Sequence, residues 1–292
     1  MRTVDVEILK TPPCRLGEGP FWDVGLARLN WVDIESSRLH CMDTNETVVS
    51  TTLGVSALTA AFPVENGWML VMDHGFGHLS EFDELTALDQ PEASKGPRVR
   101  MNDAACDPQG RLWAGSTAID CIEPIGSLFR VDLDGSVIRV LNGLTVSNGI
   151  AWSPDGQDFY LIDSIPGELW AWRFDPDDGA LRDRRLIADD IGPGIPDGMA
   201  VDEEGCLWIA CFGSGQVCRL SPQGNVISSV QLPVSFPTSV CFGGPRLDRL
   251  FVTTAQREQG EPHAGQLLTF DPRVTGLATQ SYRGAPHGGL AK

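Results

Sequence analysis

The chain lacks the sequence features that mark membrane-spanning, secreted and multidomain proteins. No apolar run reaches the roughly 18 residues that a helix needs to cross a bilayer. Charged side chains interrupt residues 1–7, which argues against the apolar core of a signal peptide and predicts a cytoplasmic protein. Prolines and glycines are scattered rather than pooled into a linker, and no segment is of low complexity. We therefore expect one domain over residues 1–292.

The chain also has no Cys-x-x-Cys pair among its eight cysteines, and its five histidines lack the spacing of metal ligands. Cys106, Cys206, Cys218 and Cys241 fall inside apolar segments, where a reduced cysteine serves as a small core residue. Because nothing points to secretion, we expect free thiols rather than disulfide bonds.

Basic residues are few: 22 lysines and arginines stand against 39 acidic residues, a net charge of −17. Such a chain repels phosphate backbones, so nucleic acid is not an expected partner, and neither is a membrane. Most of the acidic surface serves solubility, although part of it could focus a cation into a cleft.

What the chain does have is a repeat. An apolar segment, a turn rich in Asp, Pro and Gly, and a second apolar segment recur six times at a spacing of roughly 40 to 50 residues, which is typical of stacked β-sheets around an axis. The clearest copies span residues 104–114, 150–161 and 199–209, and weaker copies span residues 21–25, 62–67 and 242–245.

Each repeat is interpreted as four strands, and amphipathic helices are absent. In the fourth repeat we expect strands at residues 149–153, 158–162, 168–174 and 184–188, separated by turns such as Asp155-Gly156 and Asp178-Gly179. The sequence thus predicts an all-β, six-bladed β-propeller with four antiparallel strands per blade. Residues 4–9 have no blade of their own and are expected to close the ring as the outer strand of the last blade. Four tryptophans that recur in these strands are expected to pack between blades: Trp22, Trp113, Trp152 and Trp208.

Aligning the six first strands by their turns places oxygen-bearing side chains in one register. Five residues before each turn stand Glu18, Ala57, Asn102, Asn148, Asp197 and Pro237. In a propeller the start of each innermost strand lies at one mouth of the central channel. Asn-Gly and Asp-Gly also occur simply as turn formers, but four polar residues in one register favour convergence. Hard oxygen donors at the axis would suit a divalent cation that keeps open coordination positions.

At these residues the chain resembles the SMP-30/gluconolactonase family, the regucalcin-like, metal-dependent sugar lactonases with six blades. The resemblance covers nearly the whole chain and rests on the motifs LGEGPFW (residues 16–22), RMND (100–103), SNGIAWSPD (147–155) and PDGMAVD (196–202). It implies that Glu18, Asn148 and Asp197 are metal ligands. It implies substrate contacts at Arg100, Asn102 and Asp103. Residues 117–123 match loosely and offer Asp120 as a further substrate contact, with Glu123 as the alternative inward-facing residue.

The resemblance implies hydrolysis of a sugar lactone to the aldonic acid, with one divalent ion, Ca²⁺, Zn²⁺, Mn²⁺, Mg²⁺ or Fe²⁺, acting on the lactone carbonyl or on water. Arg100, Asn102 and Asp120 would hydrogen-bond the sugar. Asp197 is the candidate general base. A metal-bound carboxylate is a weak base, however, so a metal hydroxide oriented by Asp197 or Asp103 is the alternative.

Two other functions fit the same residues. One is an esterase or phosphotriesterase that uses the same Lewis acid. The other is a non-enzymatic propeller whose ion is structural. The sequence favours chemistry because Arg100 and Asn102 accompany the three ligand positions, and it leaves the particular lactone and the oligomeric state open.

Overall fold

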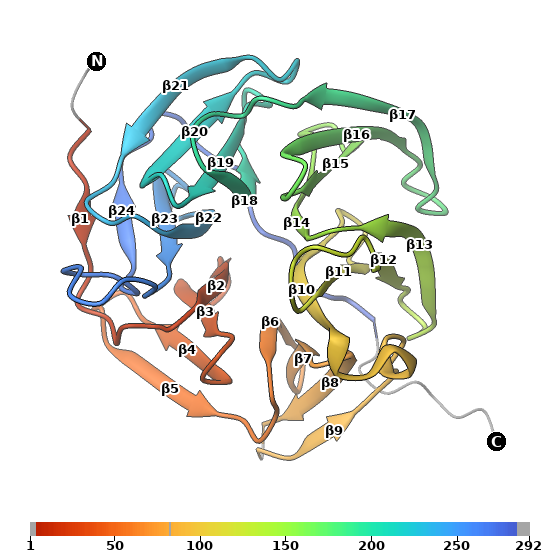
Figure 1. The fold of residues 1–292 in the computed structure, drawn as a ribbon. Helices are drawn as coiled ribbons and strands as arrows, with labels where there is room; N and C mark the ends of the chain where they lie inside the picture. Colours follow the sequence, from red (N-terminus) through yellow and green to blue (C-terminus); the bar gives the residue numbers. More distant parts are fainter. Residues whose placement is uncertain (1–3, 82, 285–292) are drawn as a thin grey trace.

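The computed structural model describes residues 4–81 and 83–284 and consists of six four-stranded antiparallel sheets arranged in a ring (Figure 1). The predicted six-bladed β-propeller is therefore confirmed. Within each blade the strands follow one another from the axis to the periphery, except in the last blade. A single short 3₁₀ helix among the described residues, η1 (Ala93–Arg98), precedes the third blade.

The strands divide among the blades as follows. Blade one contains β2 (Gly17–Asp23), β3 (Arg28–Asp33), β4 (Arg38–Met42) and β5 (Val48–Thr52). Blade two contains β6 (Leu58–Val64), β7 (Gly67–Met72), β8 (Gly75–Ser80) and β9 (Leu85–Ala87). Blade three contains β10 (Val99–Cys106), β11 (Leu112–Ala118), β12 (Gly126–Val131) and β13 (Val137–Leu144). Blade four contains β14 (Ser147–Trp152), β15 (Asp158–Asp163), β16 (Glu168–Phe174) and β17 (Leu181–Ala188). Blade five contains β18 (Ile195–Val201), β19 (Leu207–Phe212), β20 (Gln216–Leu220) and β21 (Val226–Gln231). Blade six contains β22 (Pro237–Gly243), β23 (Arg249–Thr254), β24 (Leu268–Phe270) and β1 (Glu7–Ile8).

Strand β1 closes the ring as predicted, because Glu7 pairs with Thr269 and Ile8 with Leu268 of β24. The closing strand is shorter than the expected residues 4–9. On its C-terminal side the chain soon reaches Pro12 and Pro13, which have no N–H to donate to a sheet. The ring is thus closed by the N-terminal strand β1, which lies beside β24, the last strand of the described chain, in one sheet.

Aromatic side chains fill the spaces between blades, as predicted for the tryptophans. Trp113 of blade three meets Trp152 of blade four edge-on at 6.0 Å between ring centroids. Trp208 packs against Phe242 across blades five and six at 6.3 Å, and Trp22 stacks on the blade-six ring of Phe251 at 5.9 Å. The eight cysteines are all free, and the four expected in the core are buried. The described residues contain no helix long and apolar enough to cross a membrane.

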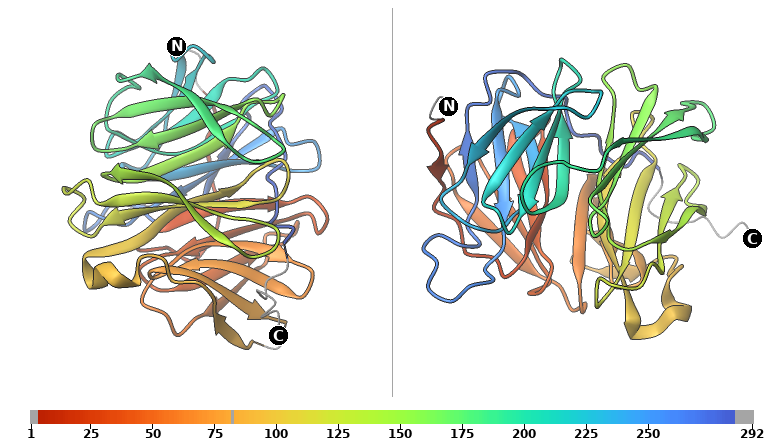
Figure 2. Two further views of the ribbon diagram at one scale, coloured as in Figure 1. Left: turned by 90° about the vertical axis from the view of Figure 1, so that its right-hand side faces the viewer. Right: turned by 45° about the horizontal axis from the view of Figure 1, so that its top comes forward.

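After β24 the chain crosses one end of the channel, the end that lies opposite the starts of the inner strands. This segment passes behind the ring in Figure 1 and runs along the right edge of the molecule in the left view of Figure 2. Gly276 bridges to Asp202, the Leu277 N–H donates to the Val201 carbonyl (3.1 Å), and Thr279 Oγ1 donates to the Trp22 carbonyl (2.8 Å). A cavity of about 320 Å³ lies between this crossing segment and the inner strands. This segment therefore covers the end of the channel at which the inner strands finish.

Candidate metal and active site

Every inner strand carries a bulge at the same level, close to the end that opens the channel. The register shifts fall between Glu18 and Phe21, Leu58 and Ala60, Met101 and Ala104, Asn148 and Ile150, Pro196 and Met199, and Pro237 and Ser239. A bulge inserts an unpaired residue and re-aims the neighbouring side chains. In blades one and four it uses Gly19 (φ 53°) and Gly149 (φ 34°), a backbone region that favours glycine.

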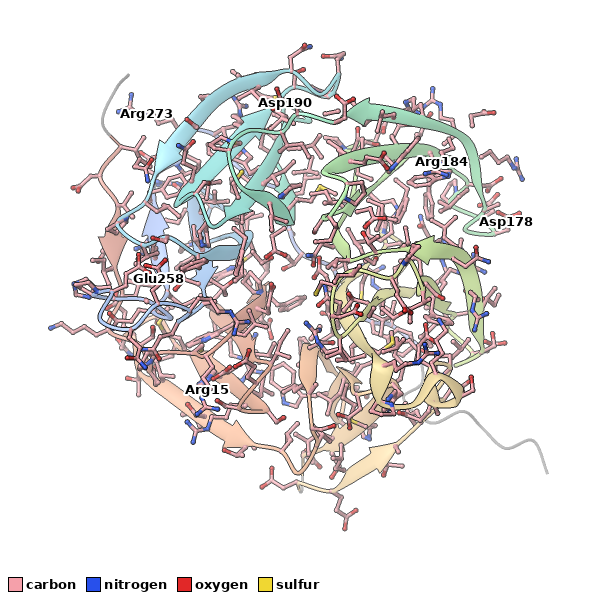
Figure 3. All side chains as sticks on the ribbon, in the orientation of Figure 1. Arg15, Asp178, Arg184, Asp190, Glu258 and Arg273 are labelled. Atoms are coloured by element: carbon pink, nitrogen blue, oxygen red, sulfur yellow. The ribbon has the colours of Figure 1, made fainter. Side chains whose placement is uncertain are left out.

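The four polar residues that the turn alignment placed in one register lie at this level. Glu18, Asn102, Asn148 and Asp197 are all buried, none more than 9% exposed. Figure 3 shows side chains of the inner strands converging on the centre of the ring, whereas the labelled Asp190 lies at the periphery. The ring geometry therefore brings together residues that are up to three blades apart.

The two asparagines are in direct contact across blades three and four. Asn102 Nδ2 donates to Asn148 Oδ1 (2.8 Å) and to the Ser147 carbonyl (3.0 Å). Asn148 Nδ2 in turn donates to Ser164 Oγ (2.9 Å). These bonds orient the Asn148 amide so that its oxygen, which has a second lone pair, remains a candidate ligand.

Three carboxylates share the site: Glu18, Asp103 and Asp197. Burial raises the pKa of Glu18 to about 8, with further repulsion from Asp103. Burial also raises the pKa of Asp197 well above its usual range, and both other carboxylates add to the effect. Burial raises the pKa of Asp103 to about 6. Hydrogen bonds from backbone N–H groups, among them that of Ala104, act in the opposite direction and lower it. The cluster is therefore a concentration of negative charge that requires protons or a cation.

Arg100 is the cation that this chain supplies to the cluster. Its Nη1 donates to Asn102 Oδ1 (2.6 Å) and to the Met101 carbonyl (2.8 Å). Burial lowers the pKa of Arg100, whereas the charges of Glu18 and Asp197 raise it. An arginine remains protonated under such conditions, so Arg100 sets a positive charge against the three carboxylates.

The loop after β11 carries Asp120 and Glu123, the two carboxylates that the sequence offers as further site residues. Asp120 is exposed, and its Oδ1 accepts a hydrogen bond from the N–H of Ile122 (3.0 Å), so it stabilises its own turn. Glu123 is also exposed and lies 3.6 Å from Arg98 Nη1. Between them, Cys121 lies near Arg100 and Asp197. The structure therefore brings neither carboxylate into the buried cluster.

Sequence reasoning missed two carboxylates that anchor the chain just before the ligand positions. Asp33 accepts hydrogen bonds from the N–H groups of Arg15 (3.1 Å) and Leu16 (3.0 Å). Asp163 accepts one from the Val146 N–H (2.9 Å) at the equivalent place in blade four. Each aspartate is the last residue of the second strand of its blade. An alignment that compares only the first strands does not detect it. These bonds fix the approach to Glu18 and Asn148.

A second acidic group lies at the opposite end of blade five. Asp202, Glu204 and Cys206 are close enough together to hold an ion. However, Arg219 Nε donates to Asp202 Oδ2 (2.8 Å), and its Nη2 donates to Glu204 Oε2 (2.6 Å). Because a guanidinium already neutralises this group, the axial cluster is the better candidate for a metal site.

Fold and site together define a six-bladed propeller with a buried, oxygen-rich cluster at one mouth of its channel. Residues 16–256 match the family model described as the SMP-30/Gluconolactonase/LRE-like region. The chain belongs to this family, as its sequence motifs predicted.

Relatives of known name cover almost the whole chain. Pentonolactonase XacC of Haloferax volcanii is 35% identical over 259 residues, which are 87% of this chain and 86% of that protein. Regucalcin of Xenopus laevis is 31% identical over 96% of this chain and 97% of its own length. The solved structure of a calcium-binding protein, regucalcin, from Agrobacterium tumefaciens superposes with a TM-score of 0.89 at 26% identity, covering 97% of this chain and all of that chain.

Proposed function

We propose that the protein hydrolyses a sugar lactone to the aldonic acid, using one divalent metal ion held by Glu18, Asn148 and Asp197. The observation that carries this proposal is the buried carboxylate cluster at the starts of the inner strands, beside Arg100. Relatives named as a pentonolactonase and a sugar lactone lactonase support the reaction class.

The donor set fits a hard divalent cation. Two carboxylates and one amide oxygen are available, and Ca²⁺, Mg²⁺, Mn²⁺, Zn²⁺ and Fe²⁺ all accept such ligands. The raised pKa values of Glu18 and Asp197 arise from burial and from repulsion by neighbouring carboxylates, Asp103 in both cases and Glu18 as well for Asp197, which a bound cation would relieve. When bound, the ion supplies Lewis-acid stabilisation of negative charge on the carbonyl oxygen.

The reaction adds water across the ring ester. A C–O bond forms between the water oxygen and the carbonyl carbon, the bond to the ring oxygen breaks, and the ring oxygen takes up a proton. Asp197 accepts the proton from water and returns it to the leaving oxygen. Asp103, whose Oδ1 accepts a hydrogen bond from the Ala104 N–H (2.8 Å), orients the water. The product is a hydroxy acid whose carboxyl group ionises.

Arg100 and Asn102 take different roles in this proposal. Both ends of the Asn102 amide are engaged, since its oxygen accepts from Arg100 and its nitrogen donates to Asn148 and Ser147. We therefore assign Asn102 the positioning of Arg100 and Asn148. Arg100 keeps further N–H groups to bind the negative oxygen or the product carboxylate. Asp120, exposed on its turn, remains a proposed partner for a distal hydroxyl group.

The test is a pH-indicator assay of five- and six-membered aldonolactones with metal-stripped enzyme and each metal in turn. We expect turnover of at least one aldonolactone that depends on added metal, at rates well above those for aryl esters and organophosphates. Faster turnover of the latter would identify an esterase or phosphotriesterase. Loss of thermal stability on metal removal, without turnover under any metal, would identify a structural ion.

Metal binding is also expected to release protons and to strengthen as the pH rises from 6 to 8. Glu18 and Asp103, with pKa values raised to about 8 and about 6, hold protons that a metal must displace. Because these native-state values exceed those of an unfolded chain, the metal-free protein should also lose stability as the pH rises from about 4 to 8. Calorimetric titration in buffers of different ionisation enthalpy measures the protons released. An enthalpy independent of the buffer would contradict the carboxylate cluster as the binding site.

A further inference from the structure

Four exposed isoleucines occur at the open mouth of the channel: Ile119, Ile122, Ile165 and Ile195. Their exposure ranges from 41% to 73%. Ile119 and Ile122 lie in the loop after β11, Ile165 follows β15, and Ile195 begins β18. In up-and-down blades the starts of inner strands and the ends of second strands share one face. The four side chains therefore belong to the same mouth and to three consecutive blades, and we name them the isoleucine rim.

Each member of the rim is next to a residue of the site. Ile195 stands two residues before Asp197 at the start of the same strand. Ile165 follows Ser164, whose hydroxyl accepts the hydrogen bond from Asn148. Ile119 and Ile122 stand two residues before and one residue after Cys121, which lies near Arg100 and Asp197. Each isoleucine thus stands within two residues of a group that lies in or beside the cluster.

The other half of the mouth is charged. Blades six and one meet there through an ion pair between Arg257 Nη1 and Glu35 Oε1 (2.5 Å), and Arg15 is exposed beside them. Among the described residues of blades six, one and two, this face carries no exposed large hydrophobic side chain. Single exposed apolar residues are ordinary. Four of them occur on blades three to five, in part within the loop that also exposes Asp120 and Glu123, whereas the described residues of the other half of the mouth include charged side chains and no such apolar group.

We propose that the isoleucine rim binds an apolar substituent on the lactone ring, so that the enzyme hydrolyses lactones carrying an alkyl side chain as well as sugar lactones. This inference rests on the proposed function, because it uses the same ring opening. Water adds to the carbonyl carbon, the ring C–O bond breaks, and the ring oxygen takes the proton. The alkyl chain lies on blades three to five, while the polar ring faces Arg100 and the carboxylates.

The test compares γ-butyrolactone with γ-decanolactone, which adds a hexyl side chain. Complete burial of one methylene favours binding about fourfold, so a partly buried hexyl chain should raise kcat/KM about tenfold or more. In the triple variant Ile119→Ser, Ile122→Ser, Ile165→Ser this preference should fall to about twofold or less, while turnover of γ-butyrolactone is retained. Calorimetric binding of γ-hydroxydecanoate against γ-hydroxybutanoate gives a second readout that needs no turnover.

The matched control is Val24→Ser, Leu26→Ser, which removes two apolar side chains of similar exposure (59% and 62%) from the turn between β2 and β3, on the far face. It should keep the full chain-length preference. Equal kcat/KM for both lactones, in an enzyme that hydrolyses an aldonolactone, overturns the role of the rim alone. No hydrolysis of any lactone with any metal overturns the proposed function. Sedimentation that shows a dimeric wild type and a monomeric triple variant would make the rim a subunit interface and also overturn the inference.

Discussion

Replacing Asp197 by asparagine is expected to lower kcat for lactone hydrolysis by about 1,000-fold at saturating metal. General bases contribute factors of roughly 10² to 10⁴, and an amide cannot accept the proton of the attacking water. Asparagine has the same size and keeps one oxygen donor, so the site stays assembled around the ion. The measurement is steady-state turnover across a metal titration, which separates a loss of kcat from a loss of metal.

Asp190→Asn is the control for this change. It makes the same substitution at an exposed aspartate just before the same blade, at the periphery of the ring (Figure 3), and should leave kcat unchanged. Wild-type turnover by Asp197→Asn with metal bound would exclude Asp197 as the base. Asp103→Asn would then test the remaining carboxylate of the cluster.

The architecture could be predicted because each blade repeats the same local chemistry. Turns such as Asp155-Gly156 mark where the first strand of a blade ends, and alternating apolar residues identify the strands on either side. The five-residue step from turn to site succeeded because every inner strand has similar length and one bulge at the same level. Residues such as Glu18 and Asp197, distant in sequence, therefore lie at the same height on the axis.

The loops could not be predicted in this way, because they lie outside that register. Asp120 was a candidate through a loose match of residues 117–123 to the family, with Glu123 as its alternative. Their placement depends on a turn in which Cys121 adopts a positive φ of 57°, for which its sequence offers no glycine as a signal. The anchoring role of Asp163 was missed for a different reason, since the alignment compared first strands only and Asp163 ends a second strand. Residues on strands were thus easier to place than residues on loops.

Glu18→Gln is expected to weaken metal binding about 100-fold and, at the same time, to stabilise the metal-free protein at pH 8. The change removes one negative charge from the donor set, and the affinity of an oxygen-ligand site depends on its charge count. In the metal-free state, repulsion from Glu18 contributes to the raised pKa of Asp197. Removing that repulsion lowers the pKa of Asp197 and reduces the free-energy cost of burying its negative charge in the metal-free protein.

These opposite effects distinguish a metal ligand from a merely structural carboxylate, whose loss would lower stability in both states. Isothermal titration measures the affinity, and thermal denaturation in chelator measures the stability of the metal-free form. Glu35→Gln makes the same change on blade one and the same face, at a glutamate that pairs with Arg257 outside the cluster, and should alter neither quantity by more than a small factor. Unchanged metal affinity in Glu18→Gln would remove Glu18 from the ligand set and leave Asp103 as the carboxylate available to replace it beside Asn148 and Asp197.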